Sequence, residues 1–210
     1  MQAKEYLKYF EDNYKQPLSE GLYSRGQRVD RFSGFKIIFE SLLFKKSNNF
    51  VIVETGCQRQ ENDWGAGQSS LLFYEFLNFF DGKLISLDNN IFHLNRSKKI
   101  LRKKFPWSTV PLVQMLGDSV TKLKKIEAPV DLVYLDSYDL DPSNPEPSMA
   151  HHLKELGSIK EILRQSIEPL IAIDDNFTDV GKGKYVLDWA RKTGQKVLYN
   201  GYQIVIQIIS

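Results

Sequence analysis

The sequence predicts an α/β fold in which a mostly parallel sheet carries helices on both faces. From about residue 50 onwards, short apolar runs alternate with longer segments of helical periodicity, as is typical of βαβ units. The chain finishes with two β-rich runs around Asn200-Gly201, a dipeptide typical of hairpins. We therefore expect a seven-stranded sheet whose last strand runs antiparallel in a C-terminal hairpin.

A helical segment precedes the first expected strand. Residues 4–14 and 31–46 both have the periodicity of helices, and a segment with glycine and arginine separates them. We assign residues 1–48 to an N-terminal helical extension or lid and residues 49–210 to one ligand-binding domain. The chain shows no internal repeat and no linker between domains.

The order of the elements follows from the apolar runs and from the residues that begin and end helices and strands. Ser69 or Ser70 is placed to cap the first crossover helix, and Pro106 ends the second. The carboxyl ends of parallel strands meet at the edge where open α/β sheets bind ligands, and acids or glycines follow most of the expected strands. Strands are expected at 50–54, 83–88, 109–117, 130–136, 169–176 and in the hairpin 196–208, with helices at 68–80, 91–105, 117–126, 148–167 and 183–194.

Composition excludes several classes of protein. With 28 Lys and Arg against 26 Asp and Glu, the formal charge of +2 is too balanced to make nucleic acid the expected partner. The 42% hydrophobic content argues against disorder, and Cys57, the single cysteine, cannot form an internal disulfide. No apolar run reaches the roughly 18 residues of a membrane span, and the N-terminus lacks a signal-peptide pattern. We expect a cytoplasmic protein.

Four features lie at successive strand ends: Glu54 and Gly56 with the Gly65-Ala66-Gly67 turn, Asp88, Asp118 with Ser119, and Asp136. In this order, over roughly residues 50–210, they resemble the class I S-adenosylmethionine-dependent methyltransferases. The resemblance implies a Rossmann-like fold, S-adenosyl-L-methionine as cofactor, ribose binding by Asp88, adenine contacts near Asp118, and Asp136 facing the transferred methyl group. The implied cofactor-binding residues are Glu54, Gly56, Gly65, Gly67, Ser69, Asp88, Asp118, Ser119 and Asp136. A polar insertion, residues 57–64, departs from the compact glycine pattern, and we place it over the methionine end of the cofactor or over the substrate.

Acidic residues after two neighbouring strands also suggest a metal. The chain is similar here to cation-dependent O-methyltransferases of the catechol and sugar types, which implies Mg²⁺ or another divalent cation held by oxygen ligands. Asp174 with Asp175 fits the sugar type and is favoured, whereas Asp175 with Asn176 fits the catechol type. The alternative is that these acids cap a turn and bind no metal. The candidate ligands are Asp136, Asp174, Asp175 and Asn176.

The candidate catalytic groups are Asp136, His151 and His152. A metal would orient a substrate hydroxyl and lower its pKa, so that a modest general base would suffice. The histidine pair opens the helix after the loop that follows Asp136, and both side chains should lie near the same edge of the sheet. They are equally well explained as solvent-facing polar residues.

The function expected from these features is O-methylation of a hydroxyl on a small molecule, such as a sugar or glycosylated metabolite, assisted by a cation. Three alternatives stay open: a metal-independent methyltransferase with Asp136 or a histidine as base, a methyltransferase-like binding module without turnover, and a nucleic-acid methyltransferase. The last is disfavoured because Asp136-Ser137-Tyr138-Asp139 differs from the motif of amine-methylating enzymes that act on nucleic acids. We expect no membrane partner, and a homodimer is left open.

Overall fold

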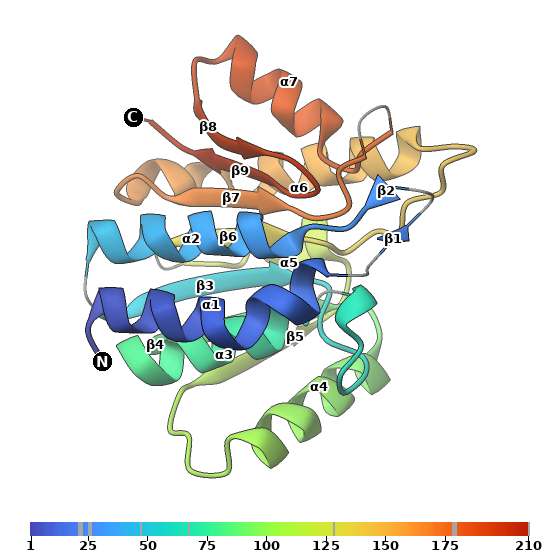
Figure 1. Cartoon of the computed structure of the whole chain (residues 1–210). Coiled ribbons are helices and arrows are strands. Elements are labelled where there is room, and N and C mark those ends of the chain that lie inside the picture. Colours follow the sequence, from blue (N-terminus) through green and yellow to red (C-terminus); the bar gives the residue numbers. More distant parts are fainter. Residues whose placement is uncertain are drawn as a thin grey trace.

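The central element is a mixed sheet of seven strands with helices on both faces (Figure 1). The computed structural model describes residues 1–20, 23–24, 27–46, 48–66, 68–127, 129–177 and 180–209. The order of the strands is β5-β4-β3-β6-β7-β9-β8, and only β9 runs against the others. The strands are β3 (Phe50–Thr55), β4 (Gly82–Asp88), β5 (Leu112–Leu116), β6 (Leu132–Leu135), β7 (Leu170–Ile173), β8 (Lys196–Asn200) and β9 (Ile204–Gln207).

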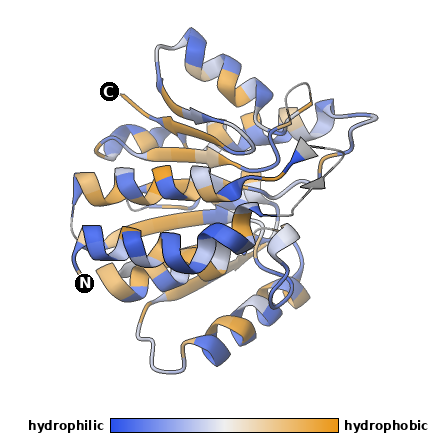
Figure 2. Cartoon of the chain, viewed as in Figure 1, coloured by the Kyte–Doolittle hydropathy of each residue, from blue (hydrophilic) through white to orange (hydrophobic). Residues whose placement is uncertain are grey.

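Alternation along the strands separates two hydrophobic clusters. In β3, for example, Phe50 and Ile52 face one cluster and Val53 faces the other. Helices α2 and α3 cover the first face, while α5, α6 and α7 cover the second, and their hydrophilic sides point outward (Figure 2). The helices are α1 (Ala3–Ser19), α2 (Arg31–Lys45), α3 (Ser69–Phe80), α4 (Ile91–Lys104), α5 (Ser119–Leu123), α6 (Glu146–Gln165) and α7 (Lys184–Lys192).

The order in which strands are added to the sheet reverses at β3, so β3 and its parallel neighbour β6 lie at a switch point. Strands β4 and β5 extend the sheet on one side of β3, and β6 and β7 extend it on the other. In open α/β sheets, the carboxyl ends of the strands at such a switch point form the crevice that binds ligands. The topology therefore directs attention to the loops after Thr55, Asp88 and Leu135.

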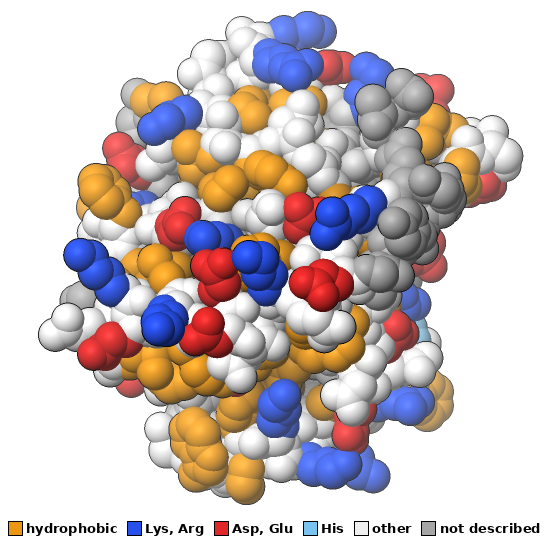
Figure 3. All heavy atoms as spheres, viewed as in Figure 1, with side chains coloured by type: hydrophobic (Ala, Val, Ile, Leu, Met, Phe, Trp, Pro, Cys, Tyr) orange, Lys and Arg blue, Asp and Glu red, His pale blue; other side chains and the backbone are white. Residues whose placement is uncertain are grey.

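The N-terminal helices share the core of the sheet. Phe35 and Phe39 of α2 are fully buried, and Tyr6 of α1 packs edge-on against Phe39 and Phe76. The outer surface of α1 and α2 mixes both signs of charge, with Glu11 between Lys15 and Lys36 (Figure 3). A short antiparallel pair, β1 (Tyr23–Ser24) with β2 (Gln27–Arg28), lies between the two helices in the chain. The lid function expected of residues 1–48 stays a prediction.

The expected α/β architecture is confirmed, and two local expectations are corrected. Strands β8 and β9 pair antiparallel, but Asn200 pairs with Ile204, so the connection has three residues instead of the two of an Asn-Gly turn. Tyr202 and Gln203 of this connection hydrogen bond inward to Asp175 and Tyr134, which requires the longer loop. No helix in the described ranges has the length and hydropathy needed to cross a membrane.

The second correction concerns the start of α3. Gln68 precedes the helix in a left-handed conformation, with φ of 52°, and makes no capping hydrogen bond. The hydroxyls of Ser69 and Ser70, which were expected to cap the helix, instead donate to Glu54 at the end of β3. Because both hydroxyls hydrogen bond to the buried carboxylate of Glu54, neither caps the N-terminus of α3.

Candidate active site

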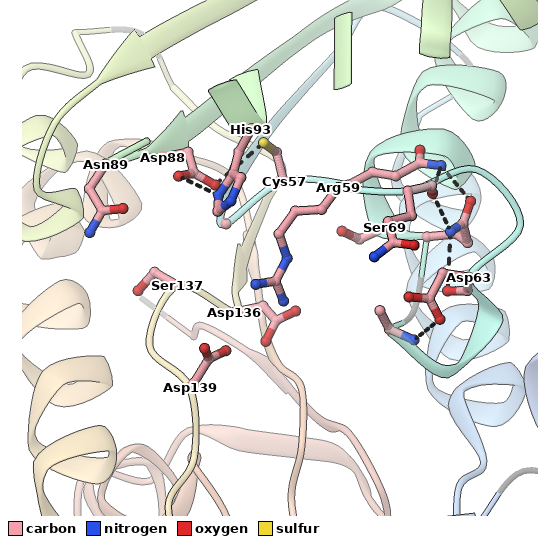
Figure 4. Close-up of a pocket in the computed structure, with 15 residues that line it drawn as sticks. Cys57, Arg59, Asp63, Ser69, Asp88, Asn89, His93, Asp136, Ser137 and Asp139 are labelled. Carbon is pink, nitrogen blue, oxygen red and sulfur yellow. Dashed lines mark hydrogen bonds and ion pairs between the residues drawn. The ribbon is translucent and has the colours of Figure 1, made fainter. Parts of the chain in front are cut away.

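A cavity of about 500 Å³ lies at the carboxyl ends of β3, β4 and β6, where the topology predicts a ligand site (Figure 4). It is bordered by the glycine turn after β3, by Asp88 after β4 and by Asp136 after β6. A smaller cavity of about 70 Å³ shares Gly56 and Asp88 with it and continues toward Asp118 and Ser119. The two cavities also share Asn89 and Ser137, so they adjoin each other, and we refer to them together as the groove.

Gly56 lets two strand ends approach closely at the centre of this groove. Its φ is +78°, a conformation that favours glycine, and a Cβ atom there would lie 2.6 Å from the carbonyl oxygen of Asp136. The backbone nitrogen of Gly56 also donates to the carbonyl of Leu87 at 2.8 Å. A glycine is therefore needed where the end of β3 passes the loop after β6, and Gly56 lines both cavities; its role in cofactor binding stays a prediction.

Asp88 presents a mostly buried carboxylate to both cavities. One oxygen, Oδ1, accepts from the backbone nitrogen of Asn90 at 2.8 Å and lies 3.3 Å from Nδ1 of His93, while Cys57 Sγ lies 3.4 Å from Oδ2. Oδ1 thus faces two protein groups, whereas among the described residues Oδ2 faces only Cys57 and keeps a lone pair that can accept a hydrogen bond from a ligand. These contacts hold the carboxylate at the border of both cavities.

Glu54 does not line either cavity. It is fully buried at the end of β3, and its carboxylate accepts from the hydroxyls of Ser86 at 2.6 Å, Ser70 at 2.7 Å and Ser69 at 3.1 Å. Burial raises the pKa of Glu54 to about 7 against the opposing effect of these hydroxyls. We therefore correct its expected role: Glu54 holds the start of α3 against β3 and β4, and Ser69 is the part of this network that lines the cavity.

The small cavity contains the residues expected at the adenine end. Asp118 caps α5 through the backbone nitrogen and hydroxyl of Thr121, and Ser119 follows it. The Nε2 atom of His151 lies 3.0 Å from the hydroxyls of both Ser119 and Ser137. His151 is thus close to the sheet edge, as predicted, but it lies at the end of the groove opposite the insertion that follows Gly56.

His152 is corrected as a candidate base. Its side chain is fully buried, and Nδ1 lies 2.7 Å from the carbonyl of Ser148 one turn earlier in α6. Burial lowers the pKa of His152 to about 4, and the residue lines neither part of the groove. The two adjacent histidines point in different directions because neighbouring helical positions are about 100° apart.

The acids expected to bind a metal do lie together, but the chain's own cations pair with them. Nζ of Lys182 lies 2.5 Å from Oδ1 of Asp136 and 3.0 Å from Oδ2 of Asp175. Nε of Arg31 lies 2.8 Å from Asp174, and NH2 of Arg31 lies 3.2 Å from Asp175. Across the part of the chain that the structure describes, no three or more His, Cys, Asp or Glu side chains are arranged to hold a metal ion.

These ion pairs decide the protonation states of the cluster. Burial opposes the charged form of Lys182, but Asp136 and Asp175 outweigh it and raise its pKa, so Lys182 is an ammonium group. Burial likewise opposes ionisation of Asp175, whereas Lys182 and Arg31 lower its pKa to about 2. Burial raises the pKa of Asp136 to about 7 against the effect of Lys182. Because Lys182 and Arg31 contact the carboxylate oxygens that a divalent cation would need, the donor set as paired here does not fit Mg²⁺, and the expected metal is not supported.

Three of the predicted residues lie apart from the cluster or outside the described residues. The amide of Asn176 donates to the carbonyl of Gly201 at 2.8 Å and to Asn200, which turns it toward the β8–β9 hairpin. The carbonyl of Gly65 accepts from Arg31 at 2.8 Å, so Gly65 orders the insertion and does not line the groove. Gly67 lies outside the residues that the structure describes.

The polar insertion forms the outer wall of the large cavity, and sequence reasoning missed its individual residues. The Nε2 atoms of Gln58 and Gln68 both donate to the carbonyl of Gln60 at 3.0 Å, which folds the insertion on itself. Arg59 extends from this wall into the cavity (Figure 4). His93 of α4 also lines it. The sequence signal for this wall was the amide and charged composition of residues 57–64, between Gly56 and the Gly65-Ala66-Gly67 turn.

Sequence similarity to known proteins is partial. No family model matches the sequence. Among curated proteins, endonuclease MutS2 of Alkaliphilus oremlandii (strain OhILAs) is 25% identical over 107 residues, which is 51% of this chain. The chain spans only 13% of the length of that protein. This match is too partial to assign a family.

Solved structures share the fold over nearly the whole chain. A candidate methyltransferase of Streptococcus mutans, crystallised with S-adenosylhomocysteine (SAH), is 14% identical, with a TM-score of 0.57 over 86% of this chain and 99% of that one. The SAH-bound methyltransferase PaMTH1 of Podospora anserina is 17% identical, with a TM-score of 0.55 over 99% of this chain and 88% of that one. A candidate caffeoyl-CoA O-methyltransferase of Staphylococcus aureus is 13% identical, with a TM-score of 0.54 over 100% of this chain and 93% of that one. The chain therefore has the Rossmann-like fold of class I methyltransferases.

Proposed function

We propose that the protein is an S-adenosylmethionine-dependent methyltransferase. The observation that carries this proposal is the pair of adjoining cavities at the switch point of the sheet, both of which Gly56 and Asp88 line. Structures with the same fold hold SAH. When bound, the cofactor supplies an electrophilic methyl group on a sulfonium sulfur.

The residues along the groove can divide the work of holding this cofactor. Asp88 accepts the ribose hydroxyls, and Ser119 with His151 borders the space for the base. Arg59 offers a cation to a carboxylate such as that of the methionine moiety. These assignments are supported by the position of each side chain in the two cavities.

The proposed reaction is transfer to a hydroxyl oxygen of a small molecule. Asp136 lies at the end of β6 and lines the large cavity, and a carboxylate whose pKa is near 7 suits a general base. The acceptor oxygen attacks the methyl carbon, the bond from that carbon to sulfur breaks, and the hydroxyl proton passes to Asp136. The products are the methyl ether and SAH.

The size and the lining of the cavity support a polar acceptor. Asp63, Asp139 and several amide groups line a volume of about 500 Å³, and such groups recognise hydroxyls of sugars or glycosylated metabolites. The candidate caffeoyl-CoA O-methyltransferase of Staphylococcus aureus, which has the same fold, lends further support to oxygen as the acceptor atom.

The test is methyl transfer from isotopically labelled S-adenosylmethionine to a fraction of polar small molecules, read by mass spectrometry with chelator present. The proposed function predicts labelled methyl ethers with the wild-type protein and their loss with Asp88→Ala. Label that appears only in RNA or DNA, supplied as acceptors in a parallel reaction, would favour the nucleic-acid alternative instead. Wild-type protein that binds no cofactor would favour a binding module.

A further inference from the structure

Lys182 occupies the centre of the acidic cluster at the end of the large cavity. Its side chain is only 2% exposed, although lysine is rarely buried unless it is paired. The ammonium contacts Asp136 on one side and Asp175 on the other, while the backbone nitrogen of Lys182 donates to the carbonyl of Asp175 at 3.2 Å. Both the main chain and the side chain of this residue are therefore fixed to the loop after β7.

The glycines on either side of Lys182 allow this close approach. A Cβ atom on Gly181 would collide with the side-chain oxygen of Asn176, and one on Gly183 would collide with Ile204 of β9. Gly183 is also the N-cap residue of α7. The segment Gly181-Lys182-Gly183 thus passes too close to the sheet edge for larger residues at the two glycines. This path places the ammonium of Lys182 between Asp136 and Asp175.

Charge within the cluster is already close to balanced. Three carboxylates face two cations, because Arg31, 4% exposed, pairs with Asp174 and Asp175 as Lys182 does with Asp136 and Asp175. A divalent cation entering here would have to displace the ammonium from the oxygens that it needs as ligands. Carboxylate oxygens such as those of Asp136, Asp174 and Asp175 are the ligands that Mg²⁺ and Mn²⁺ prefer, and here they contact Lys182 and Arg31 instead.

We propose that Lys182 is a built-in counterion that takes the place of the divalent cation used by cation-dependent O-methyltransferases and that positions the carboxylate of Asp136 at the reacting end of the cavity. This inference rests on the proposed function for its second part. Its first part, the exclusion of metal from the cluster, depends only on the ion pairs described above.

Metal binding tests the first part without cofactor or acceptor. Mn²⁺ binding is measured by electron paramagnetic resonance and Mg²⁺ binding by calorimetry on the whole chain, for wild type, Lys182→Ala and the matched control Lys184→Ala. Lys184 lies two residues away, half exposed, and pairs with Asp188. We expect no saturable site in wild type or in the control, and a gain of about ten-fold or more in Mn²⁺ affinity for Lys182→Ala, corresponding to at least 1.4 kcal/mol.

Two results would overturn this part. One is a saturable Mn²⁺ site in wild type that is lost in Asp175→Asn, because the ammonium would then not exclude metal. The other is a folded Lys182→Ala protein with no gain in Mn²⁺ affinity. If Lys182→Ala fails to fold, Lys182→Gln replaces it, and the wild-type measurement alone still decides the exclusion of metal.

Kinetics test the positioning of Asp136. Lys182→Gln should lower kcat about 100-fold or more while the Kd for SAH stays within about three-fold, and Lys182→Arg should restore part of kcat because it returns the charge. A Lys182→Gln protein with unchanged kcat would contradict the positioning role. Failure of wild type to bind SAH would reject the proposed function and leave the metal result standing.

Discussion

Arg31 and Asp174 join two parts of the chain that lie 143 residues apart. Nε of Arg31 donates to both carboxylate oxygens of Asp174, at 2.8 Å and 3.1 Å, and both side chains are buried. The same guanidinium reaches the carbonyl of Gly65 in the polar insertion. One residue at the start of α2 therefore connects the N-terminal helices, the wall of the cavity and the end of β7.

Removal of this cation should destabilise the protein strongly. Arg31→Met leaves Asp174 buried without a partner, so we expect the free energy of unfolding to fall by about 3–5 kcal/mol in urea titrations. Arg164→Met, which breaks an exposed pair with Glu161, should cost less than about 0.5 kcal/mol. Adding Asp174→Asn to Arg31→Met should recover part of the loss, and a double variant less stable than the single one would contradict this account.

The aromatic cluster beneath α1 offers a second test of stability. Phe39 is fully buried and stacks on Phe76 with ring centroids 5.0 Å apart, whereas Phe44 on the same helix is 91% exposed. Phe39→Ala should lower the free energy of unfolding by about 3–5 kcal/mol, and Phe44→Ala should change it by less than about 0.5 kcal/mol. Equal effects of the two substitutions would show that α2 is not packed as described.

Glu54 should make stability depend on pH. Its native pKa of about 7 exceeds the ordinary value of 4.5, so the native state binds more protons than the unfolded state between these values. The contribution of Glu54 to stability is therefore full below about pH 4.5 and is lost as the pH rises through 7. Relative to wild type, Glu54→Gln should gain about 3 kcal/mol between acid and mildly alkaline pH. Urea titrations at the two extremes measure this, and a difference that is constant with pH would refute it.

Asp136 should matter for turnover more than for cofactor binding. Asp136→Asn removes the proposed base, so we expect kcat to fall by about 10²–10⁴-fold with the acceptor found by labelling, while the Kd for SAH changes little. Asp12→Asn, an exposed substitution on α1, serves as the control. A loss confined to KM would indicate that Asp136 binds the acceptor and does not accept its proton.

Much of the fold could be predicted from the sequence because its signals are local. Apolar runs ending in acids or glycines marked β3, β4, β6 and β7, and the hairpin run marked β8 and β9. The position of Asp88 at a strand end followed directly from this. The start of α3 could not be predicted, because the serines that resemble caps are taken by Glu54, a residue about 15 positions earlier.

The site was harder to predict where it depends on contacts between distant segments. Asp136, Asp174 and Asp175 could be brought together by strand order alone, but their partners come from the start of α2 and from the loop before α7. Neither Arg31 nor Lys182 carries a sequence signal for pairing with these acids. The polar insertion likewise showed its composition but not which side chain, such as Arg59, would enter the cavity.

The most direct test of the proposed function is calorimetric titration of the protein with SAH, in the presence of Mg²⁺ and then of chelator. We predict saturable binding with the same Kd in both conditions, and a loss of about ten-fold or more in Asp88→Ala, whose ribose acceptor is gone. No binding by wild type at millimolar SAH would contradict the assignment as a methyltransferase, and binding only with Mg²⁺ would contradict the role of Lys182.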